Sequence, residues 1–371
     1  MQRFKFNMGG IGFRLGAGRL LSLADPCSTV EWETSLWTPI VACINSLLGK
    51  SGSDSVALVG PTVSGNRYGI ILAPNGCLYC IPRAATDILK VDPSDDSVST
   101  FGSLGGSDKW AGGALAPNGI IYGAPFSSAS VLKIDPSDDS TSTFGSIAGS
   151  SKHIGAVVAP NGCVYCVPFD ATTVLKIDPT DDSTSSFGSL SGVQKWFGGT
   201  LAPNGMIYCA PWNSTTVLKI NPADDTASTI GSVAAGSNKW GGAVLAPNGM
   251  IYCIPVDSTT ILKINPADDT VSTFGSLPGS SKWVTGALAA NGKIYCTPRS
   301  ETTILVIDPT DDSTYTFGSL AGSVKWVGCA IAPSGDIYGA PFNSTSIVKI
   351  TPDATNKPNN ETILSKYFNK L

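Results

Sequence analysis

The stretch KWAGGALAPNGIIYGAP, Lys109–Pro125, recurs in near copies along most of this 371-residue chain. Each copy carries a glycine equivalent to Gly119. These glycines follow one another at intervals of 43, 43, 43, 44, 43 and 43 residues: Gly76, Gly119, Gly162, Gly205, Gly249, Gly292 and Gly335. The chain therefore contains seven repeats, with a period found in propeller blades, paired-helix solenoids and β-solenoids.

Within one repeat the pattern excludes helices and predicts four short strands. Proline occurs several times per repeat, and the apolar residues do not recur every 3.6 positions. Asn118-Gly119 is a tight-turn signal, and the strands predicted around it are Ala111–Ala116, Ile120–Ala124, Val131–Asp135 and Thr141–Phe144. Four antiparallel strands repeated seven times are typical of an all-β, seven-bladed β-propeller. The small residues of the first strand suit its crowded axis.

The repeats divide the chain into an N-terminal docking arm, residues 1–54, and the propeller, residues 55–371. Within the arm, Thr34–Lys50 could form one amphipathic helix, with Pro39 near its first turn. Two segments compete to supply the outer strand of the last blade. Ser55–Gly60 aligns with the fourth strand of the repeats, and Glu361–Leu364 could occupy the same place; we favour the N-terminal segment.

The composition and the N-terminal sequence indicate which classes of partner the protein lacks and in which cellular compartment it is made. Charged residues make up 14% of the chain and the net charge is −4, which does not suggest a nucleic-acid partner. Arg14 and Arg19 interrupt the apolar residues near the N-terminus, so no secretion signal is predicted. No apolar run approaches the length of a transmembrane helix. We expect a protein made in a reducing cytoplasm, without membrane insertion.

The ten cysteines include CLYC, Cys77–Cys80, and CVYC, Cys163–Cys166, which look like metal-binding knuckles. On a strand, residues i and i+3 point to opposite faces, so these pairs should not converge on a metal. Equivalent blade positions are also held too far apart for regular disulfides. We therefore expect buried free thiols that pack in the core, and neither a metal nor another cofactor.

Residues 66–350 resemble a widespread repeat family built on K-W-x-G-G-x-L-A-P-N-G-x-I-Y-x-x-P followed by V-L-x-I-D-P. The ending Ile363–Leu371 is similar to that family's usual terminus. More distantly, the repeats look like NHL and virginiamycin B lyase-type propellers. The resemblance implies the propeller fold but no single chemistry. In lyase-type propellers a histidine at the mouth is a general base.

Loops of a four-stranded blade alternate between its two ends. The Asn-Gly turn and an Asp-rich turn share one end, called here the Asp-rich end. Paired carboxylates there could hold calcium, but Asp also favours turns by bonding its own backbone, which is the reading we prefer. The pairs are Asp95-Asp96, Asp138-Asp139, Asp181-Asp182, Asp224-Asp225, Asp268-Asp269 and Asp311-Asp312, with Asp353-Ala354 in the seventh repeat.

The opposite end, called here the variable end, is the predicted ligand-binding face. Tryptophans open most first strands, with His153 and Arg67 at the equivalent places: Trp110, Trp196, Trp240, Trp283 and Trp326. A lysine precedes each of six of these positions and would favour anionic ligands: Lys109, Lys152, Lys195, Lys239, Lys282 and Lys325. The residue that opens the loop after each second strand varies from blade to blade among arginine, phenylalanine, tryptophan and valine: Arg83, Phe126, Phe169, Trp212, Val256, Arg299 and Phe342.

Aromatic platforms beside polar groups suit a glycan or a receptor peptide. The alternative is that each tryptophan packs between adjacent blades, with the lysine covering it. The chain has one histidine and no HExxH, P-loop or G-x-S-x-G motif, so we expect no enzyme. We predict an interaction module, mounted through residues 1–54 on other subunits of an assembly such as a virion. The alternatives are a purely structural subunit and a lyase or hydrolase that uses His153.

Overall fold

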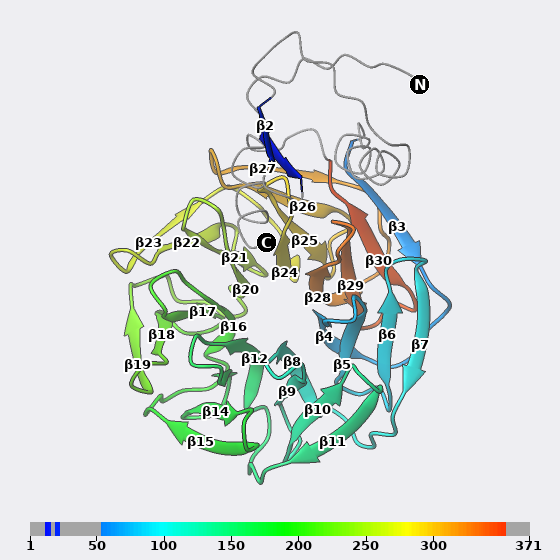
Figure 1. Ribbon diagram of the computed structural model, residues 1–371. Coiled ribbons are helices and arrows are strands. Elements are labelled where there is room, and N and C mark those ends of the chain that lie inside the picture. Colours follow the sequence, from blue (N-terminus) through cyan, green and yellow to red (C-terminus); the bar gives the residue numbers. More distant parts are fainter. Residues whose placement is uncertain (1–11, 16–18, 23–52, 354–371) are drawn as a thin grey trace, which may run out of the picture. The chain divides into compact units, whose positions relative to one another are not determined.

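A computed structural model describes three parts of the chain: residues 12–15, 19–22 and 53–353 (Figure 1). The predicted helix at Thr34–Lys50 and the segment Glu361–Leu364 lie outside these residues. All regular elements of the described parts are strands. None of these parts contains a helix with the length and apolar character needed to span a membrane.

The chain divides into two compact units, residues 1–51 and residues 52–371. In the first unit, β1 (Gly12–Leu15) and β2 (Arg19–Ser22) form an antiparallel pair in which Gly12 lies opposite Ser22.

The second unit is a ring of seven four-stranded antiparallel sheets, which confirms the predicted β-propeller (Figure 1). The first strands of the blades line the axis: β4 (Arg67–Leu72), β8 (Trp110–Leu115), β12 (His153–Val158), β16 (Trp196–Leu201), β20 (Trp240–Leu245), β24 (Trp283–Leu288) and β28 (Trp326–Ile331). The second strands are β5 (Leu78–Pro82), β9 (Ile121–Pro125), β13 (Val164–Pro168), β17 (Ile207–Pro211), β21 (Ile251–Pro255), β25 (Ile294–Pro298) and β29 (Ile337–Pro341).

The outer half of each blade follows in chain order. The third strands are β6 (Ile88–Asp92), β10 (Val131–Asp135), β14 (Val174–Asp178), β18 (Val217–Asn221), β22 (Ile261–Asn265), β26 (Ile304–Asp308) and β30 (Ile347–Thr351). The outermost strands are β7 (Ser97–Phe101), β11 (Ser140–Phe144), β15 (Ser183–Phe187), β19 (Thr226–Ile230), β23 (Thr270–Phe274), β27 (Ser313–Phe317) and β3 (Ser55–Val59). The four strands predicted for the second repeat agree with β8–β11 to within one residue at each end.

The ring closes through the N-terminal strand β3, as favoured from the sequence. It pairs antiparallel with β30, so that Ser55 lies opposite Thr351 and Val59 lies opposite Ile347. Blade seven is therefore built from both ends of the propeller sequence. Closure leaves no blade with three strands, which protects the sheet edges of the ring.

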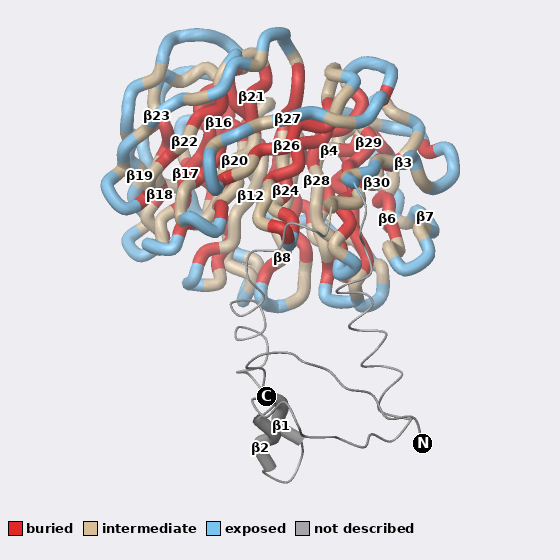
Figure 2. Tube along the Cα trace, turned by 90° about the horizontal axis from the view of Figure 1, so that it is seen from above, coloured by how far each residue is buried: buried red, intermediate tan, exposed pale blue. Residues whose placement is uncertain are grey.

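Apolar clusters between neighbouring blades form the core (Figure 2). The second strands are fully buried, while the outermost strands alternate between exposed and partly buried residues. Cys77 packs in the cluster between blades one and two, and Cys80 packs in the cluster between blades seven and one. The two thiols thus lie on opposite faces of one sheet, as predicted. Burial raises the pKa of Cys80 to about 12.

Backbone contact between glycines brings the first strands together at the axis. A β-carbon added to Gly112, whose φ is +79°, would lie 2.8 Å from the α-carbon of Gly155. A β-carbon on Gly155 would in turn lie 2.9 Å from the α-carbon of Gly198. These distances are shorter than van der Waals contact, so a side chain could not be added at these glycines without moving the strands apart. Blade six differs, because Thr285 occupies the equivalent position and accepts a hydrogen bond from the Gly328 N–H. A narrow channel of about 230 Å³ remains along the axis.

Candidate functional site

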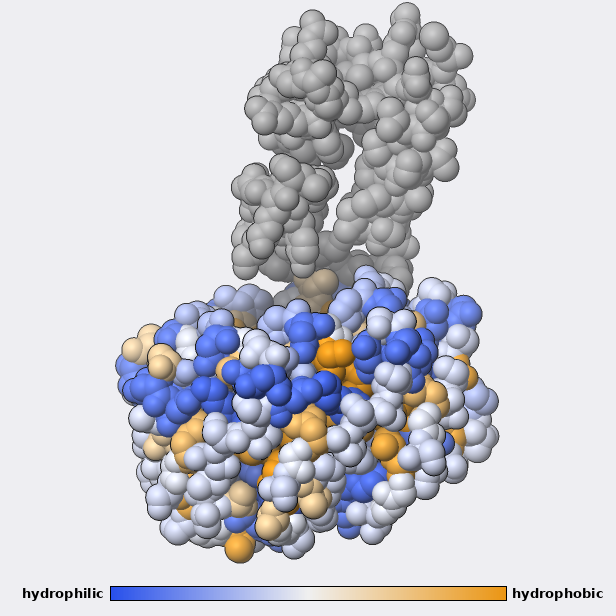
Figure 3. All heavy atoms as spheres, turned by 60° about the horizontal axis from the view of Figure 1, so that its bottom comes forward, coloured by the Kyte–Doolittle hydropathy of each residue, from blue (hydrophilic) through white to orange (hydrophobic). Residues whose placement is uncertain are grey.

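At the Asp-rich end, the first aspartate of each pair stabilises its own turn. Asp138 accepts a hydrogen bond from the backbone N–H of Ser140 at 3.0 Å, and Asp95 accepts one from Ser97 at 2.9 Å. The preferred turn chemistry is therefore present in the structure. Strongly hydrophilic residues form a band along one end of the ring wall, and the rest of that wall is mostly near neutral in hydropathy (Figure 3).

The second aspartate of each pair connects neighbouring blades, which the sequence analysis missed. Tyr79 donates its hydroxyl hydrogen to Oδ1 of Asp139 at 2.7 Å, and Lys90 Nζ lies 2.6 Å from Oδ2. Burial opposes ionisation of Asp139, but these two donors hold its pKa below the ordinary value. The same Tyr–Asp–Lys arrangement occurs at five further junctions, around Asp182, Asp225, Asp269, Asp312 and Asp96.

These contacts occupy the carboxylates that calcium would need. Among the described residues, no group of three or more His, Cys, Asp or Glu side chains is close enough together to hold a metal ion. The aspartates therefore act as part of the scaffold, in the turns and between the blades.

Asp54 completes the seventh junction in place of the missing Asp pair. Tyr295 donates its hydroxyl hydrogen to Oδ1 of Asp54 at 2.7 Å. The backbone N–H of Asp353 donates to the same oxygen, also at 2.7 Å, and Tyr315 donates to Oδ2. Asp54 precedes β3, just as Asp96 precedes β7. The N-terminal segment thus supplies both the strand and the carboxylate that the seventh repeat lacks.

The five predicted platform tryptophans lie in the core, not on an exposed face. Their side chains are 2–3% exposed. Each indole N–H donates to a backbone carbonyl 20 residues further along the chain; for example, Trp110 Nε1 lies 2.8 Å from the oxygen of Ser130. This placement corrects the expected exposure and matches the alternative, in which Trp110, Trp196, Trp240, Trp283 and Trp326 pack between blades.

The lysines before these positions are also buried, at 0–5% exposure. Lys282 Nζ donates to the carbonyls of Val256, Ser258 and Gly279, each at 2.9 Å. Burial lowers the pKa of the Lys282 ammonium from its ordinary value. We expected these lysines to attract an anionic ligand, and this expectation is wrong. Their ammonium groups donate to backbone carbonyls within the loops and do not face a ligand.

His153 replaces tryptophan in blade three and is 3% exposed. The backbone of Thr173 and Pro125 lies close to its ring nitrogens, but neither nitrogen makes a hydrogen bond of good geometry within the described residues. Burial lowers its pKa to about 4, although the nearby backbone of Thr173 and Pro125 partly opposes this shift. A buried imidazole in the wedge between blades cannot meet a substrate at the mouth. The geometry therefore gives no support to His153 as a general base.

Arg67 replaces tryptophan in blade one and is 1% exposed. Its guanidinium pairs with Asp87 and donates to the carbonyls of Ser64, at 2.6 Å, and Gly65, at 3.1 Å. Where other blades have tryptophan, blade one thus has arginine, and the carboxylate of Asp87 on the neighbouring loop neutralises its charge.

Most of the variable loop residues converge at the mouth of the channel. Phe126, Phe169 and Trp212 are 6–8% exposed, and Val256 is fully buried. They pack with the second residues of the first strands and form what we call the mouth cluster: Ala111, Phe126, Ile154, Phe169, Phe197, Trp212, Val256, Val284 and Val327, with Tyr68 and Phe342 partly buried against it. The Tyr68 and Phe197 rings come from blades one and four, and their centroids are 5.8 Å apart. Aromatic side chains therefore close the channel at this end.

Arg83, Arg299 and Phe342 stay partly exposed beside this cluster. The Arg83 guanidinium lies 4.6 Å from the centroid of the Phe126 ring and 5.0 Å from that of Tyr68, which is cation–π geometry. Its Nε lies 2.6 Å from the carboxylate of Asp108. Sequence reasoning identified the loop residues but missed Tyr68, because a single aromatic residue in a first strand has no sequence signal of its own.

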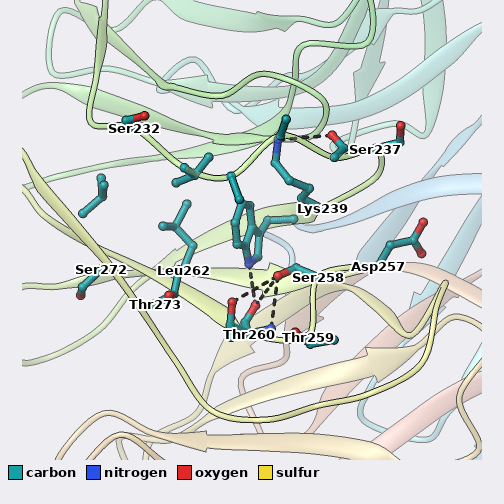
Figure 4. Close-up of a pocket in the computed structure, with 16 residues that line it drawn as sticks. Ser232, Ser237, Lys239, Asp257, Ser258, Thr259, Thr260, Leu262, Ser272 and Thr273 are labelled. Carbon is teal, nitrogen blue, oxygen red and sulfur yellow. Dashed lines mark hydrogen bonds between the residues drawn. The ribbon is translucent and has the colours of Figure 1, made fainter.

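A second cavity, of about 520 Å³, lies beside blade five, between β23 and the connection from β19 to β20 (Figure 4). Ten positions separate Ile230 from Trp240, whereas nine separate Phe101 from Trp110 in the second repeat. The bond from Lys239 Nζ to the Gly236 carbonyl is accordingly long, 3.4 Å. Hydroxyl groups around the cavity, including Ser258 and Thr260, bond within their own loop. The cavity therefore lies beside a connection that is one residue longer than its equivalents.

Comparison with family models and with curated proteins gives no match for this chain. Solved structures do match its fold. A streptogramin B lyase is 13% identical with a TM-score of 0.71, and the match covers 80% of this chain and 97% of the lyase. Another match is a catalytically inactive histidine-to-alanine variant of virginiamycin B lyase from Staphylococcus aureus, with quinupristin. It is 12% identical with a TM-score of 0.71, and the match covers 81% of this chain and 99% of the lyase.

Hydrazine synthase from Kuenenia stuttgartiensis is 15% identical with a TM-score of 0.61, and the match covers 76% of this chain and 95% of that chain. At such identities the likeness shows the fold alone. The predicted resemblance to virginiamycin B lyase-type propellers is thus confirmed for the fold, while the repeat family is not confirmed.

Proposed function

We propose that this protein is a non-enzymatic interaction module of a larger assembly, such as a virion. Residues 1–54 attach the propeller to other subunits, and the variable end binds a receptor or a glycan. The observation that carries the proposal is the chemical difference between the two ends. The Asp-rich end repeats one Tyr–Asp–Lys set of contacts at six of the seven junctions, whereas the loops of the variable end open with arginine, phenylalanine, tryptophan or valine.

The path of the chain supports this division of roles. The propeller begins beside Asp54 and its described part ends at Asp353, and the backbone N–H of Asp353 bonds to the Asp54 carboxylate. Both residues lie at the Asp-rich end. The described part of the propeller thus begins and ends at the end opposite the mouth cluster, and function tends to reside on the loops that vary.

The side chains at the mouth also favour binding over catalysis. Those that remain partly exposed are arginine and aromatic residues: Arg83, Arg299, Tyr68 and Phe342. A catalytic base needs an orienting partner and an electrophilic group beside it. The chain's one histidine, His153, is buried elsewhere.

Binding to glycan arrays and host cells tests the proposal. Phe342→Ala and Arg83→Gln should each weaken binding by about tenfold or more, because they remove contact surface at the mouth. Leu58→Ala is the matched control, since Leu58 is 54% exposed on the outer strand β3. Circular dichroism would check the fold of each variant. Equal binding by all the variants, or no binding by the wild type, would favour a purely structural subunit.

A further inference from the structure

The outermost strand of blade seven, β3, has a surface unlike those of the other outermost strands. It pairs with β30 along one edge, and its other edge has no strand partner among the described residues. Leu58 on this strand is 54% exposed. The equivalent positions of the other six blades carry hydroxyl side chains: Thr100, Thr143, Ser186, Thr229, Thr273 and Thr316. Blade seven therefore presents an apolar side chain where the other blades are polar.

Tyr315, on the outermost strand β27 of blade six, adds a second exposed apolar side chain at the same junction. Val56 and Phe317 both pack in the cluster between blades six and seven. Leu58 lies two residues after Val56, and Tyr315 lies two residues before Phe317, so each shares the strand face of that neighbour. Tyr315 is 39% exposed, and its hydroxyl donates to Asp54, just before β3. The two exposed side chains thus belong to the junction between blades six and seven.

β3 also lacks the features that keep an exposed strand from pairing with another chain. Such features include charged side chains, proline and β-bulges. The strand, Ser55–Val59, contains neither a charged residue nor proline. Its five residues pair with β30 in one register without a shift. Its free edge therefore offers straight, regular backbone N–H and C=O groups to a further strand.

We propose that the free edge of β3 pairs antiparallel with β3 of a second copy of this chain, so that two blades form one continuous sheet. With Ala57 on the twofold axis, Leu58 lies opposite Val56 of the second copy. Both side chains then point to the same face of the joined sheet, where opposite apolar residues stabilise strand pairing. A twofold contact needs a surface that is complementary to itself, and this uncharged strand meets that condition.

The position of Asp54 favours this antiparallel pairing of two copies. In that register Asp54 lies opposite Gly60 of the second copy, and the two Asp54 carboxylates stay at opposite ends of the paired strands. A parallel pairing would place the like charges side by side, which is destabilising. Asp54 also keeps its hydrogen bonds to Tyr295 and Tyr315 within its own ring.

This self-association goes beyond the proposed function and does not depend on it. β3 lies on the outer wall of the ring, whereas the mouth cluster lies at the axis (Figure 1). A single subunit can therefore bind a ligand at the mouth without pairing through β3, and the two proposals can fail separately.

Sedimentation velocity of the full chain over a range of concentrations tests the inference. We expect a monomer–dimer equilibrium for the wild type. Leu58→Lys should raise the dissociation constant of the dimer at least about tenfold, because it places like charges on one face of the joined sheet. Thr143→Lys is the matched control, since Thr143 is exposed at the equivalent position of β11 in blade two. It should leave the dimer unchanged.

A cysteine variant tests the register of the pairing and does not rely on loss of association. Residues opposite each other in an antiparallel pair have β-carbons close enough for a disulfide. With an added thiol oxidant, Ala57→Cys should therefore give a cross-linked dimer. Ser142→Cys, at the equivalent position of β11, is the control and should give none beyond the wild-type level.

Three outcomes would overturn the inference. They are a wild type that stays monomeric, equal association of the two lysine variants, and equal cross-linking of the two cysteine variants. A monomeric wild type would mean that a different protein, or another segment of this chain, covers β3. Circular dichroism would check the fold of each variant, and the cysteine pair decides the question if Leu58→Lys fails to fold.

Discussion

The residue that opens each first strand is buried, so any polar atom of its side chain needs a hydrogen-bond partner inside the core. Five blades use tryptophan, whose indole N–H bonds to a carbonyl. Blade one uses Arg67 and adds Asp87 as its partner. Blade three uses His153 and adds no acid, and its buried ring nitrogens make no hydrogen bond of good geometry, although the backbone of Thr173 and Pro125 is near. An unpaired buried polar group costs about 1–3 kcal/mol, so blade three is the least well satisfied of the seven at this position.

His153→Trp should therefore stabilise the protein, by about 1 kcal/mol or more. The pKa of His153 is lowered from 6.5 to about 4, so the unfolded chain takes up the proton first. The stability held by the neutral ring is complete above pH 6.5 and is lost as the pH falls through about 4. Thermal unfolding between pH 7 and pH 4 should show a steeper fall for the wild type than for the variant. Parallel curves would contradict this assignment.

At the scale of the strand, glycine is needed for two separate reasons. It tolerates a left-handed backbone, and it has no side chain to clash with a neighbouring strand. Gly112 has φ +79° and its missing β-carbon would meet Gly155. Gly119, in the Asn-Gly turn, has φ +84° and open space around it. The two positions share their backbone strain and differ in packing, which makes them a matched pair.

Gly112→Ala should destabilise the propeller by about 3 kcal/mol or more, because strain and steric overlap add. Gly119→Ala should cost about 1 kcal/mol, from the left-handed backbone alone. Urea unfolding of both variants measures the difference. Equal losses would mean that the first strands can separate at the axis without cost.

The strands and their order could be predicted from the sequence because each repeat carries its own turns and alternation, seven times over. The placement of the site could not, since it depends on which face of a blade meets its neighbour. In the sequence, Lys282 has the character of a surface charge. In the structure, three carbonyls from two loops surround its ammonium group. From the sequence, Asp54 belongs to the N-terminal arm. In the structure, ring closure places it beside Tyr295, which donates a hydrogen bond to it. Such contacts join residues far apart in the chain, and no local pattern encodes them.

At the scale of the whole molecule, the stability of the ring depends on its closing junction. Asp54 accepts hydrogen bonds from Tyr295, Tyr315 and the backbone of Asp353. These connect blade six, blade seven and the start of the propeller. Among the described residues no lysine pairs with Asp54, because Val306 stands where other blades place one, so the donors to this carboxylate are uncharged.

Asp54→Ala should lower the free energy of unfolding by about 2–4 kcal/mol, because several donors lose one charged acceptor. Asp95→Ala is the control, since Asp95 is exposed and bonds within its own turn; it should cost about 1 kcal/mol or less. Chemical denaturation followed by tryptophan fluorescence compares the two. A loss for Asp54→Ala no larger than for Asp95→Ala would show that β3 alone closes the ring.

The pairing of β3 with β30 also sets the order of events during synthesis on the ribosome. Ser55 emerges early, yet its partner Thr351 lies 296 residues later in the chain. Blades one to six can form one after another, while β3 waits with both edges unpaired. A chain that stops before residue 351 keeps an open strand edge, which can pair with another chain. The last blade therefore distinguishes chains that reach β30 from chains that stop before it, because only the former can pair β3.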